Sequence, residues 1–243
     1  MNGYVSDCRR ILYEIGNAER KAAGEYVSPK GEILMTTPVA FGRRHALPVV
    51  TAFLATYPDI DVRMMMSDRN THLLDEHIDL AVRIGRLPDS SLRATQVGTV
   101  SQVICGSARY FARHGVPQTL HDLTRLSCIT FDSLSPTSSW LFADTDGKEQ
   151  AVTVRSRLAV STAEAAVDAA ISGLGVTRVL SYQAMEAVKE GKLQVVLAAF
   201  QSNPVPVSLL YAYHDPLPLK IRSFLDFAVP RLREHAAMGG WDF

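Results

Sequence analysis

The sequence predicts an α/β protein with two Rossmann-like lobes that are joined by two crossover strands. Two stretches support this fold class, because each passes from an apolar strand through hydroxyl side chains into a helix: residues 31–57, GEILMTTPVAFGRRHALPVVTAFLATY, and residues 158–180, LAVSTAEAAVDAAISGLGVTRVL. Two strand-forming stretches, near 92–106 and 205–213, are long enough to cross between lobes. A chain that crosses twice forms a hinge, and a hinged cleft suits a protein that closes on a ligand.

Length and composition allow a sizeable core and argue against several classes of protein. The chain has 243 residues, of which 47% are hydrophobic, and its 25 Lys+Arg balance its 25 Asp+Glu. This balance gives no overall attraction for nucleic acid or an anionic membrane. No run of about 20 apolar residues could span a membrane, and the start MNGYVSDCRR lacks the apolar run of a secretory signal. We therefore expect a cytoplasmic chain without a membrane partner.

The N-terminal segment 4–25 predicts an amphipathic helix that needs a partner. Its apolar side chains recur at helical spacing: Val5, Cys8, Ile11, Leu12 and Ile15. Because this stripe is too narrow to anchor a lone helix in water, we expect the helix to pack on another chain or on a domain outside this sequence. The stretch VSPK at 27–30 ends it, so residues 1–30 are expected to form a helix and a connector.

We call the strand-to-helix connections in the stretches 31–57 and 158–180 the first and the second joint. The first joint opens a βαβαβ unit that is complete by Gly85. Thr37 is expected to cap the helix, with Pro38 at its first position. Further elements are expected as strands at 60–66 and 78–85, a short helix at 71–77 and a C-terminal amphipathic helix at 219–233. We expect this lobe, lobe I, to comprise residues 31–104 and 208–236.

Residues 105–207 are expected to form lobe II. Its elements are expected as helices at 107–114, 121–126 and 182–189, strands at 128–131 and 193–197, and a hairpin that joins 140–142 to 151–160. At the second joint, Ser161 and Glu164 fit a capping box. The tail at 237–243 is expected to be disordered.

Candidate ligand-binding residues gather at the two joints and at one strand end. Thr36, Thr37, Ser161 and Thr162 lie where helix N-termini leave free N–H groups that attract an anion. The same residues can equally serve only as helix caps, and both interpretations stay open. Arg86 follows the terminal glycine of a buried strand, so it is a candidate contact for a carboxylate, with a solvated loop residue as the alternative.

Motifs for catalysis, metals and cofactors are not found. The sequence contains no HExxH, no GxSxG elbow and no GxxxxGK[ST] phosphate loop. His72 and His77 are five residues apart and do not share one side of a helix, which favours a solvated turn over a metal site. Cys8, Cys105 and Cys128 are widely spaced structural thiols, with a redox pair of Cys105 and Cys128 as the alternative. We therefore expect no catalytic residue, no metal and no cofactor.

Four stretches of the chain resemble the LysR-type transcriptional regulators: residues 36–62, TTPVAFGRRHALPVVTAFLATYPDIDV; 78–98, IDLAVRIGRLPDSSLRATQVG; 173–182, GLGVTRVLSY; and 218–229, PLKIRSFLDFAV. The resemblance covers nearly the whole chain, and the match near IDLAVRIG is the most specific. It implies an effector-binding domain of the type II periplasmic-binding-protein-like fold. It also implies that the N-terminal helix is the end of the family's linker helix, which pairs in a dimer.

The resemblance further implies which residues contact the effector: Thr36, Thr37, Ser67, Arg86, Ser101, Gln102, Thr130, Phe131, Ser161 and Thr162. It implies a dimer or tetramer, and contact with promoter DNA only through a winged helix-turn-helix domain that these residues do not include. Our interpretation is a sensing domain that binds a small anionic metabolite in the interlobe cleft and alters dimer or tetramer geometry to control transcription. The alternative is a free-standing cytoplasmic solute-binding protein of the same fold.

Overall fold

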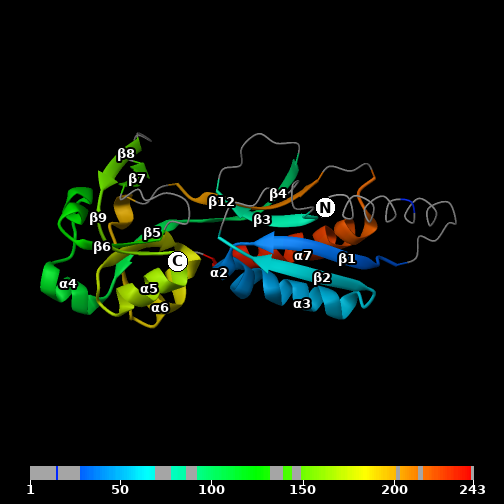
Figure 1. Ribbon diagram of the computed structural model, residues 1–243, viewed down its shortest axis with the longest axis horizontal. Coiled ribbons are helices and arrows are strands. Elements are labelled where there is room, and N and C mark those ends of the chain that lie inside the picture. The colour runs from blue at the N-terminus through cyan, green and yellow to red at the C-terminus, as the bar shows by residue number, and fades with distance from the viewer. Residues whose placement is uncertain are drawn as a thin grey trace, which may run out of the picture.

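The protein forms two α/β lobes that lie side by side along its long axis (Figure 1). The computed structural model describes residues 15, 28–68, 78–85, 92–131, 139–143, 149–200, 203–212 and 216–241. Except for Ile15, the expected helix at 4–25 lies outside the described residues, and so does the expected helix at 71–77. No helix among the described residues is long and apolar enough to cross a membrane.

Lobe I is built on a five-stranded mixed sheet in the order β2-β1-β3-β12-β4. Its strands are β1 (Gly31–Thr37), β2 (Ile60–Met66), β3 (Leu80–Ile84), β4 (Leu92–Val100) and β12 (Val205–Ala212). Strand β1 runs parallel to β2 and β3, and β12 runs antiparallel to β3 and β4. The expected parallel strands therefore form, and β12 returns the chain to this lobe from the other one.

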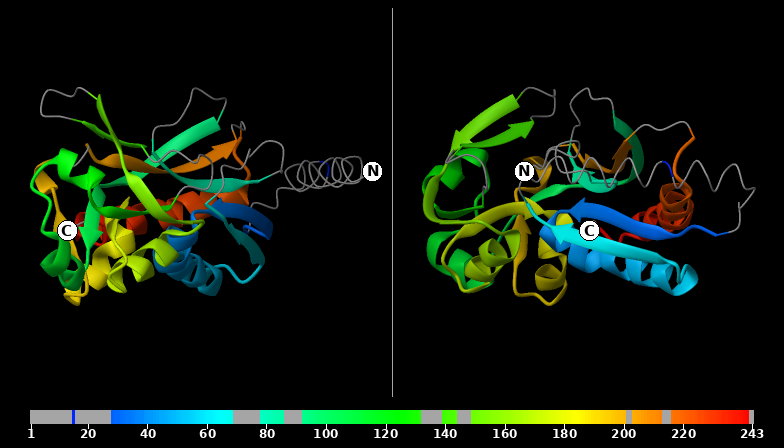
Figure 2. Two further views of the ribbon diagram at one scale, coloured as in Figure 1. Left: turned by 60° about the vertical axis from the view of Figure 1, so that its left-hand side comes forward. Right: turned by 45° about the vertical axis from the view of Figure 1, so that its right-hand side comes forward.

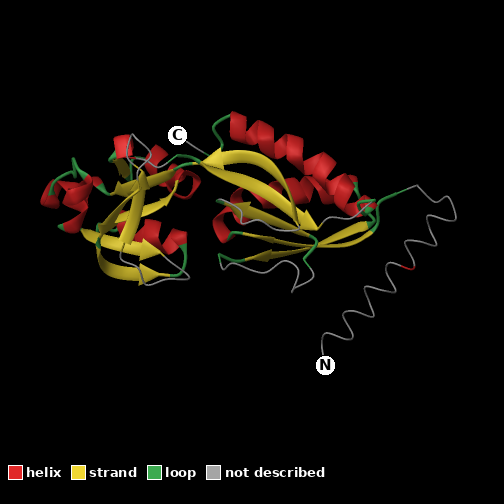
Figure 3. Ribbon diagram, turned by 90° about the horizontal axis from the view of Figure 1, so that it is seen from above, coloured by secondary structure: helices red, strands yellow, loops and turns green. Residues whose placement is uncertain are grey.

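One face of this sheet is covered by two helical segments (Figures 1 and 3). The first is continuous from α2 (Val39–Phe41) through the π-helical turn η1 (Gly42–Ala46) to α3 (Leu47–Thr56), and the second is α7 (Leu219–Ala237). Their apolar faces meet where the rings of Phe53 and Phe224 pack edge to face at 5.0 Å. This packing buries the apolar side chains whose helical spacing predicted both helices.

Lobe II holds a second five-stranded sheet in the order β11-β5-β10-β6-β9, and a separate hairpin. The strands of the sheet are β5 (Gln102–Gly106), β6 (Ser127–Phe131), β9 (Arg155–Val160), β10 (Val176–Leu180) and β11 (Gln194–Val196), and the hairpin pairs β7 (Ser139–Ala143) with β8 (Glu149–Thr153). The predicted strand at 151–160 is therefore two strands. Its first part pairs with β7, while its second part pairs with β6, and one straight strand cannot serve two separate sheets.

Apolar cores lie on both faces of the second sheet. The helices of this lobe are α4 (Ala108–His114), the 3-10 turns η2 (Leu120–Thr124) and η3 (Ala198–Phe200), α5 (Ala163–Ile171) and α6 (Ser181–Lys189). The hairpin, green in Figure 2, covers one face together with α4 and η2, and α5 and α6 cover the other. Cys128 lies in the first core and Cys105 in the second, so the sheet separates them and the alternative of a redox pair is wrong. Burial raises the pKa of each thiol to about 12.

The chain leaves the first sheet at Ser101 and enters it again at Val205. The predicted strand near 92–106 is thus split at Ser101 into β4 of lobe I and β5 of lobe II. The lobe limits proposed from the sequence, 104/105 and 207/208, fall a few residues from these two points. The first crossing is the single residue Ser101, which places the hinge there.

The C-terminal segment is ordered as far as the structure describes it, so the prediction of a disordered tail is wrong there. Helix α7 continues to Ala237, and the side chain of Trp241 is only 1% exposed. Its ring packs on Phe41 at 5.1 Å, and its carbonyl accepts a hydrogen bond of 2.7 Å from Ser181 Oγ in lobe II. A Cβ atom on Gly98 would lie 2.3 Å from this ring. The buried area of one large aromatic side chain outweighs the entropy of a short tail.

Trp241 belongs to a cluster that joins the two lobes. Tyr182, at the start of α6, packs into the core of lobe I, and Arg44 donates to its carbonyl at 3.0 Å and pairs with Glu186 at 3.4 Å. His45 lies beside Tyr182, and its Nδ1 is 3.2 Å from Nε2 of His235. Burial, together with the charges of His235 and Arg44, lowers the pKa of His45 to about 4, so this imidazole is neutral at pH 7.

Candidate functional site

The first joint brings together the ends of two parallel strands, as the sequence predicted. Thr36 and Thr37 end β1 and are at most 1% exposed, and the N–H of Ser67, just beyond β2, donates to the carbonyl of Thr37 at 2.9 Å. Thr37 is not the helix cap, which corrects the prediction. It is still part of the strand, its Oγ1 donates to the carbonyl of Pro38, and Pro38 itself occupies the capping position without a side-chain hydrogen bond.

A carboxylate already occupies the helix start at this joint. Asp68 Oδ1 accepts a hydrogen bond of 3.0 Å from the N–H of Val39, the first residue of α2. The pKa of Asp68 is raised overall, because burial and the negative charge of Glu164 raise it more than the hydrogen bond from Val39 lowers it. An anionic ligand at this helix start would have to compete with Asp68. Arg86, the predicted partner of such a ligand, lies outside the described residues.

The second joint is formed by the ends of β6 and β9 and by the start of α5. Thr130 and Phe131 end β6, and Ser161 and Thr162 follow β9. The helix cap is Thr162, whose Oγ1 accepts a bond of 3.3 Å from the N–H of Ala165, so the predicted capping box of Ser161 and Glu164 is wrong. Ser161 comes one residue too early and is exposed to solvent.

The start of α5 also carries a carboxylate. Glu164 lies in its first turn, and its Oε2 is buried with no hydrogen-bond partner in the described part of the chain. The negative charge of Glu164, in lobe II, contributes to raising the pKa of Asp68, in lobe I. The sequence did not predict that a carboxyl side chain stands at each helix start.

We expect Thr162→Val to lower the free energy of unfolding by about 1 kcal/mol, because the substitution removes the capping hydroxyl. Ser161→Ala is the matched control, and we expect a change close to zero because this side chain caps nothing. Urea unfolding of the two variants and the wild type measures the difference. A larger loss for Ser161→Ala than for Thr162→Val would contradict this assignment of the cap.

The last two predicted residues, Ser101 and Gln102, lie at the hinge. They are close to Arg178, which was not predicted as a site residue. Ser101 is 8% exposed, and its carbonyl accepts a bond of 2.8 Å from the N–H of Ser181. Gln102 begins β5, and its Oε1 accepts a hydrogen bond from the guanidinium of Arg178 on β10. The ring of Phe142 lies 4.6 Å from Cζ of Arg178. Burial lowers the pKa of Arg178 to about 10, so it remains a cation at pH 7.

The structure therefore divides the predicted residues into three groups. Those at the first joint are Thr36, Thr37 and Ser67; those at the second joint are Thr130, Phe131, Ser161 and Thr162; and those at the hinge are Ser101 and Gln102. Asp68 and Arg178 were missed as site residues. The signal for Arg178 was a charged residue inside the apolar strand VTRVL, whereas Asp68 follows its strand as an ordinary charged loop residue would.

The described residues offer no alternative built around a metal. They contain no group of three or more His, Cys, Asp and Glu side chains that could hold a metal ion. His45 and His235 are close to each other, but the rings around them are those of Phe41, Tyr182 and Trp241. Small-molecule binding between the lobes is the chemistry that this arrangement supports best.

Comparisons with known proteins agree with this arrangement. A family model described as the LysR substrate binding domain matches residues 27–233. The chain is 28% identical over 222 residues to the probable HTH-type transcriptional regulator LtrA of Klebsiella pneumoniae, covering 90% of this chain and 72% of LtrA. It is 27% identical over 230 residues to the HTH-type transcriptional regulator CrgA of Neisseria meningitidis serogroup C, covering 94% of this chain and 76% of CrgA.

Solved structures show the same fold. The full-length structure of AphB, a Vibrio cholerae virulence activator, matches with a TM-score of 0.75 and 27% identity, covering 93% of this chain and 77% of that chain. The CrgA regulatory domain from Neisseria meningitidis matches with a TM-score of 0.73 and 26% identity, covering 84% of this chain and all of that chain. These relatives are named as transcriptional regulators and not as enzymes, which agrees with the prediction of a non-catalytic chain.

Proposed function

The chain belongs to the LysR family of transcriptional regulators, and from that premise we propose that it senses a small metabolite bound between its two lobes. The observation that carries this proposal is that each lobe ends its parallel strands in a strand-to-helix joint, and that the chain passes from one lobe to the other at Ser101. Both joints lie at carboxyl ends of parallel strands, which is where open α/β folds place ligands. The fold itself is the type II periplasmic-binding-protein-like fold of the family's regulatory domains.

The proposed effector is small and anionic, and it contacts residues of both lobes and the hinge. Support for an anion at the first joint is weakened by Asp68, which already bonds to the start of α2. Support is stronger at the hinge, where Gln102 and the cation of Arg178 lie together. Closure of the lobes on this effector would change the geometry of a dimer or tetramer of the chain and so control transcription.

Contact with promoter DNA is proposed only through a winged helix-turn-helix domain outside these residues. The balance of 25 positive and 25 negative residues supports this division of labour, because specific DNA binding needs a concentrated positive surface. A free-standing solute-binding protein remains the second candidate. It has less support, because the relatives are named as transcriptional regulators.

A thermal-shift screen of metabolites tests the proposal. A compound at 100 times its Kd should add about 2.7 kcal/mol to the free energy of unfolding, which raises the melting temperature measurably. Ser161→Trp places a large ring at the second joint, so we expect it to abolish the shift that the best compound gives. Ala52→Trp, on the exposed face of α3, is the matched control and should leave the shift unchanged. The proposal fails if no compound stabilises the wild type, or if both variants respond equally.

A further inference from the structure

Arg178 is a charged side chain inside an apolar strand at the interlobe end of lobe II. It lies in β10, two residues before Leu180, which pairs with Gln102 next to the hinge. Because side chains alternate along a strand, Arg178 faces the same side of the sheet as Val176, and this side carries the β7-β8 hairpin. The hairpin contributes Phe142, whose ring covers the guanidinium.

The charge of Arg178 is only partly compensated within the described residues. Its guanidinium has five N–H donors, and the described chain supplies one side-chain acceptor, Oε1 of Gln102. No carboxylate of the described residues forms an ion pair with it. Arg178 is half-buried, and holding a charge partly away from water without a counter-charge is costly. The guanidinium therefore has donors to spare for a group that is not part of the fold.

The surroundings of Arg178 favour an anion more than the helix starts do. On the neighbouring parallel strand β6, Ile129 pairs with Thr177 of β10. The residues that follow them, Thr130 and Arg178, therefore face the same side of the sheet. The hydroxyl of Thr130 is 2.7 Å from the hydroxyl of Ser156, which adds polar groups near the guanidinium. At the helix starts, by contrast, Asp68 accepts the hydrogen bond from the first N–H of α2, and Glu164 lies in the first turn of α5. Both carboxylates oppose the binding of an anionic ligand there.

We propose that Arg178 binds a carboxylate group of the effector, while Gln102 orients the guanidinium and Phe142 forms an apolar wall beside it. This inference rests on the proposed function and names the chemical class that the site accepts. The donors of a guanidinium lie in its plane, so a ring over its face leaves them free for a bidentate bond to a carboxylate. Gln102, Thr130 and Phe142 add no second positive charge, which matches a monoanion better than a phosphate dianion.

Calorimetric titration against a metabolite library tests the assignment. In this library each carboxylate is accompanied by its amide, for example benzoate with benzamide, and methyl phosphate and inorganic phosphate are included. We expect carboxylates, and neither amides nor phosphates, to bind the wild type. Arg178→Gln should lower the affinity for the best carboxylate by about 10- to 100-fold, the range for one charge-assisted hydrogen bond. Arg157→Gln, an exposed arginine of β9, two strands away from β10 in the same sheet, is the control and should bind as the wild type does.

A second measurement needs no ligand. In Arg178→Met a flexible apolar side chain replaces the half-buried cation, so we expect the melting temperature of the free protein to stay the same or rise. A guanidinium with a purely structural role would give a clear fall instead, and that fall would overturn the inference.

The outcomes separate the inference from the proposed function. If Arg178→Gln binds carboxylates as tightly as the wild type, or if only amides, amines or phosphates bind, the role of Arg178 is wrong while metabolite sensing stands. If no compound binds the wild type at all, the proposed function itself fails. Loss of carboxylate binding in Arg178→Gln but not in Arg157→Gln, with an unchanged or raised melting temperature for Arg178→Met, supports both.

Discussion

Replacing Trp241 with alanine should lower the free energy of unfolding by about 3–5 kcal/mol, the usual loss for a fully buried tryptophan. The side chain is 1% exposed and packs against Phe41, His45 and His235. Its removal leaves a cavity where lobe I meets the start of α6. Urea unfolding measures the loss, and small-angle scattering should show whether the lobes also move apart.

Met238→Ala is the matched control for this prediction, because Met238 follows the same helix and is 79% exposed. Its effect should stay within about 0.5 kcal/mol. Gly98 provides a second check, since a Cβ there would lie 2.3 Å from the ring of Trp241. Gly98→Ala should therefore cost less in the Trp241→Ala background than in the wild type. Equal losses for Trp241→Ala and Met238→Ala would show that the C-terminal segment does not join the lobes.

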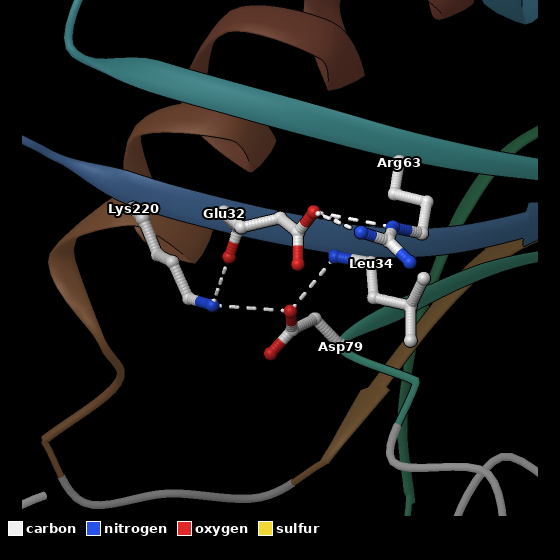
Figure 4. Close-up of polar contacts among 5 residues, drawn as sticks. All are labelled: Glu32, Leu34, Arg63, Asp79 and Lys220. Atoms are coloured by element: carbon white, nitrogen blue, oxygen red, sulfur yellow. Dashed lines mark hydrogen bonds and ion pairs between the residues drawn. The ribbon is translucent and has the colours of Figure 1, made fainter. Parts of the chain in front are cut away.

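Replacing Lys220 with alanine should cost about 3 kcal/mol, at the lower end of the range for breaking a buried ion pair. Figure 4 shows the reason: the ammonium of Lys220, at the start of α7, lies between the carbonyl of Glu32 and the carboxylate of Asp79. The ion pair with Asp79 measures 3.1 Å, and the side chain of Lys220 is only 8% exposed. The same carboxylate accepts a bond of 2.9 Å from the N–H of Leu34, so Lys220 ties α7 to β1 and to the residue before β3.

Arg63→Ala is the control for this ion pair, because Arg63 pairs with Glu32 at 3.1 Å in the same region but is 69% exposed. Such a surface pair contributes about 0–1 kcal/mol. Chemical unfolding of the two variants should therefore give clearly different midpoints. If Lys220→Ala is no less stable than Arg63→Ala, the buried pair does not fasten α7 to the sheet.

Local patterns were sufficient to predict most of the fold. The apolar stretches at 60–66, 128–131 and 205–213 became strands, and the helix predicted at 219–233 formed, because alternation and helical spacing each bury one face. The split at Ser101 was not visible, since strands of two different sheets follow one another there without a turn residue. The C-terminal segment was also mispredicted, because its order depends on the burial of Trp241 against residues that are distant in the sequence.

The sequence by itself determined the fold class, the family resemblance and the positions of the two joints, since all three depend on residues that are close together in the chain. The tertiary structure alone decided which groups meet at those joints. Asp68 bonds to Val39 from 29 residues away, and Arg178 reaches Gln102 across 76. Such pairings depend on strand order and register, which local spacing does not encode. Local spacing therefore could not place Arg178 beside Gln102 at the hinge, which is where we propose that the effector's anionic group binds.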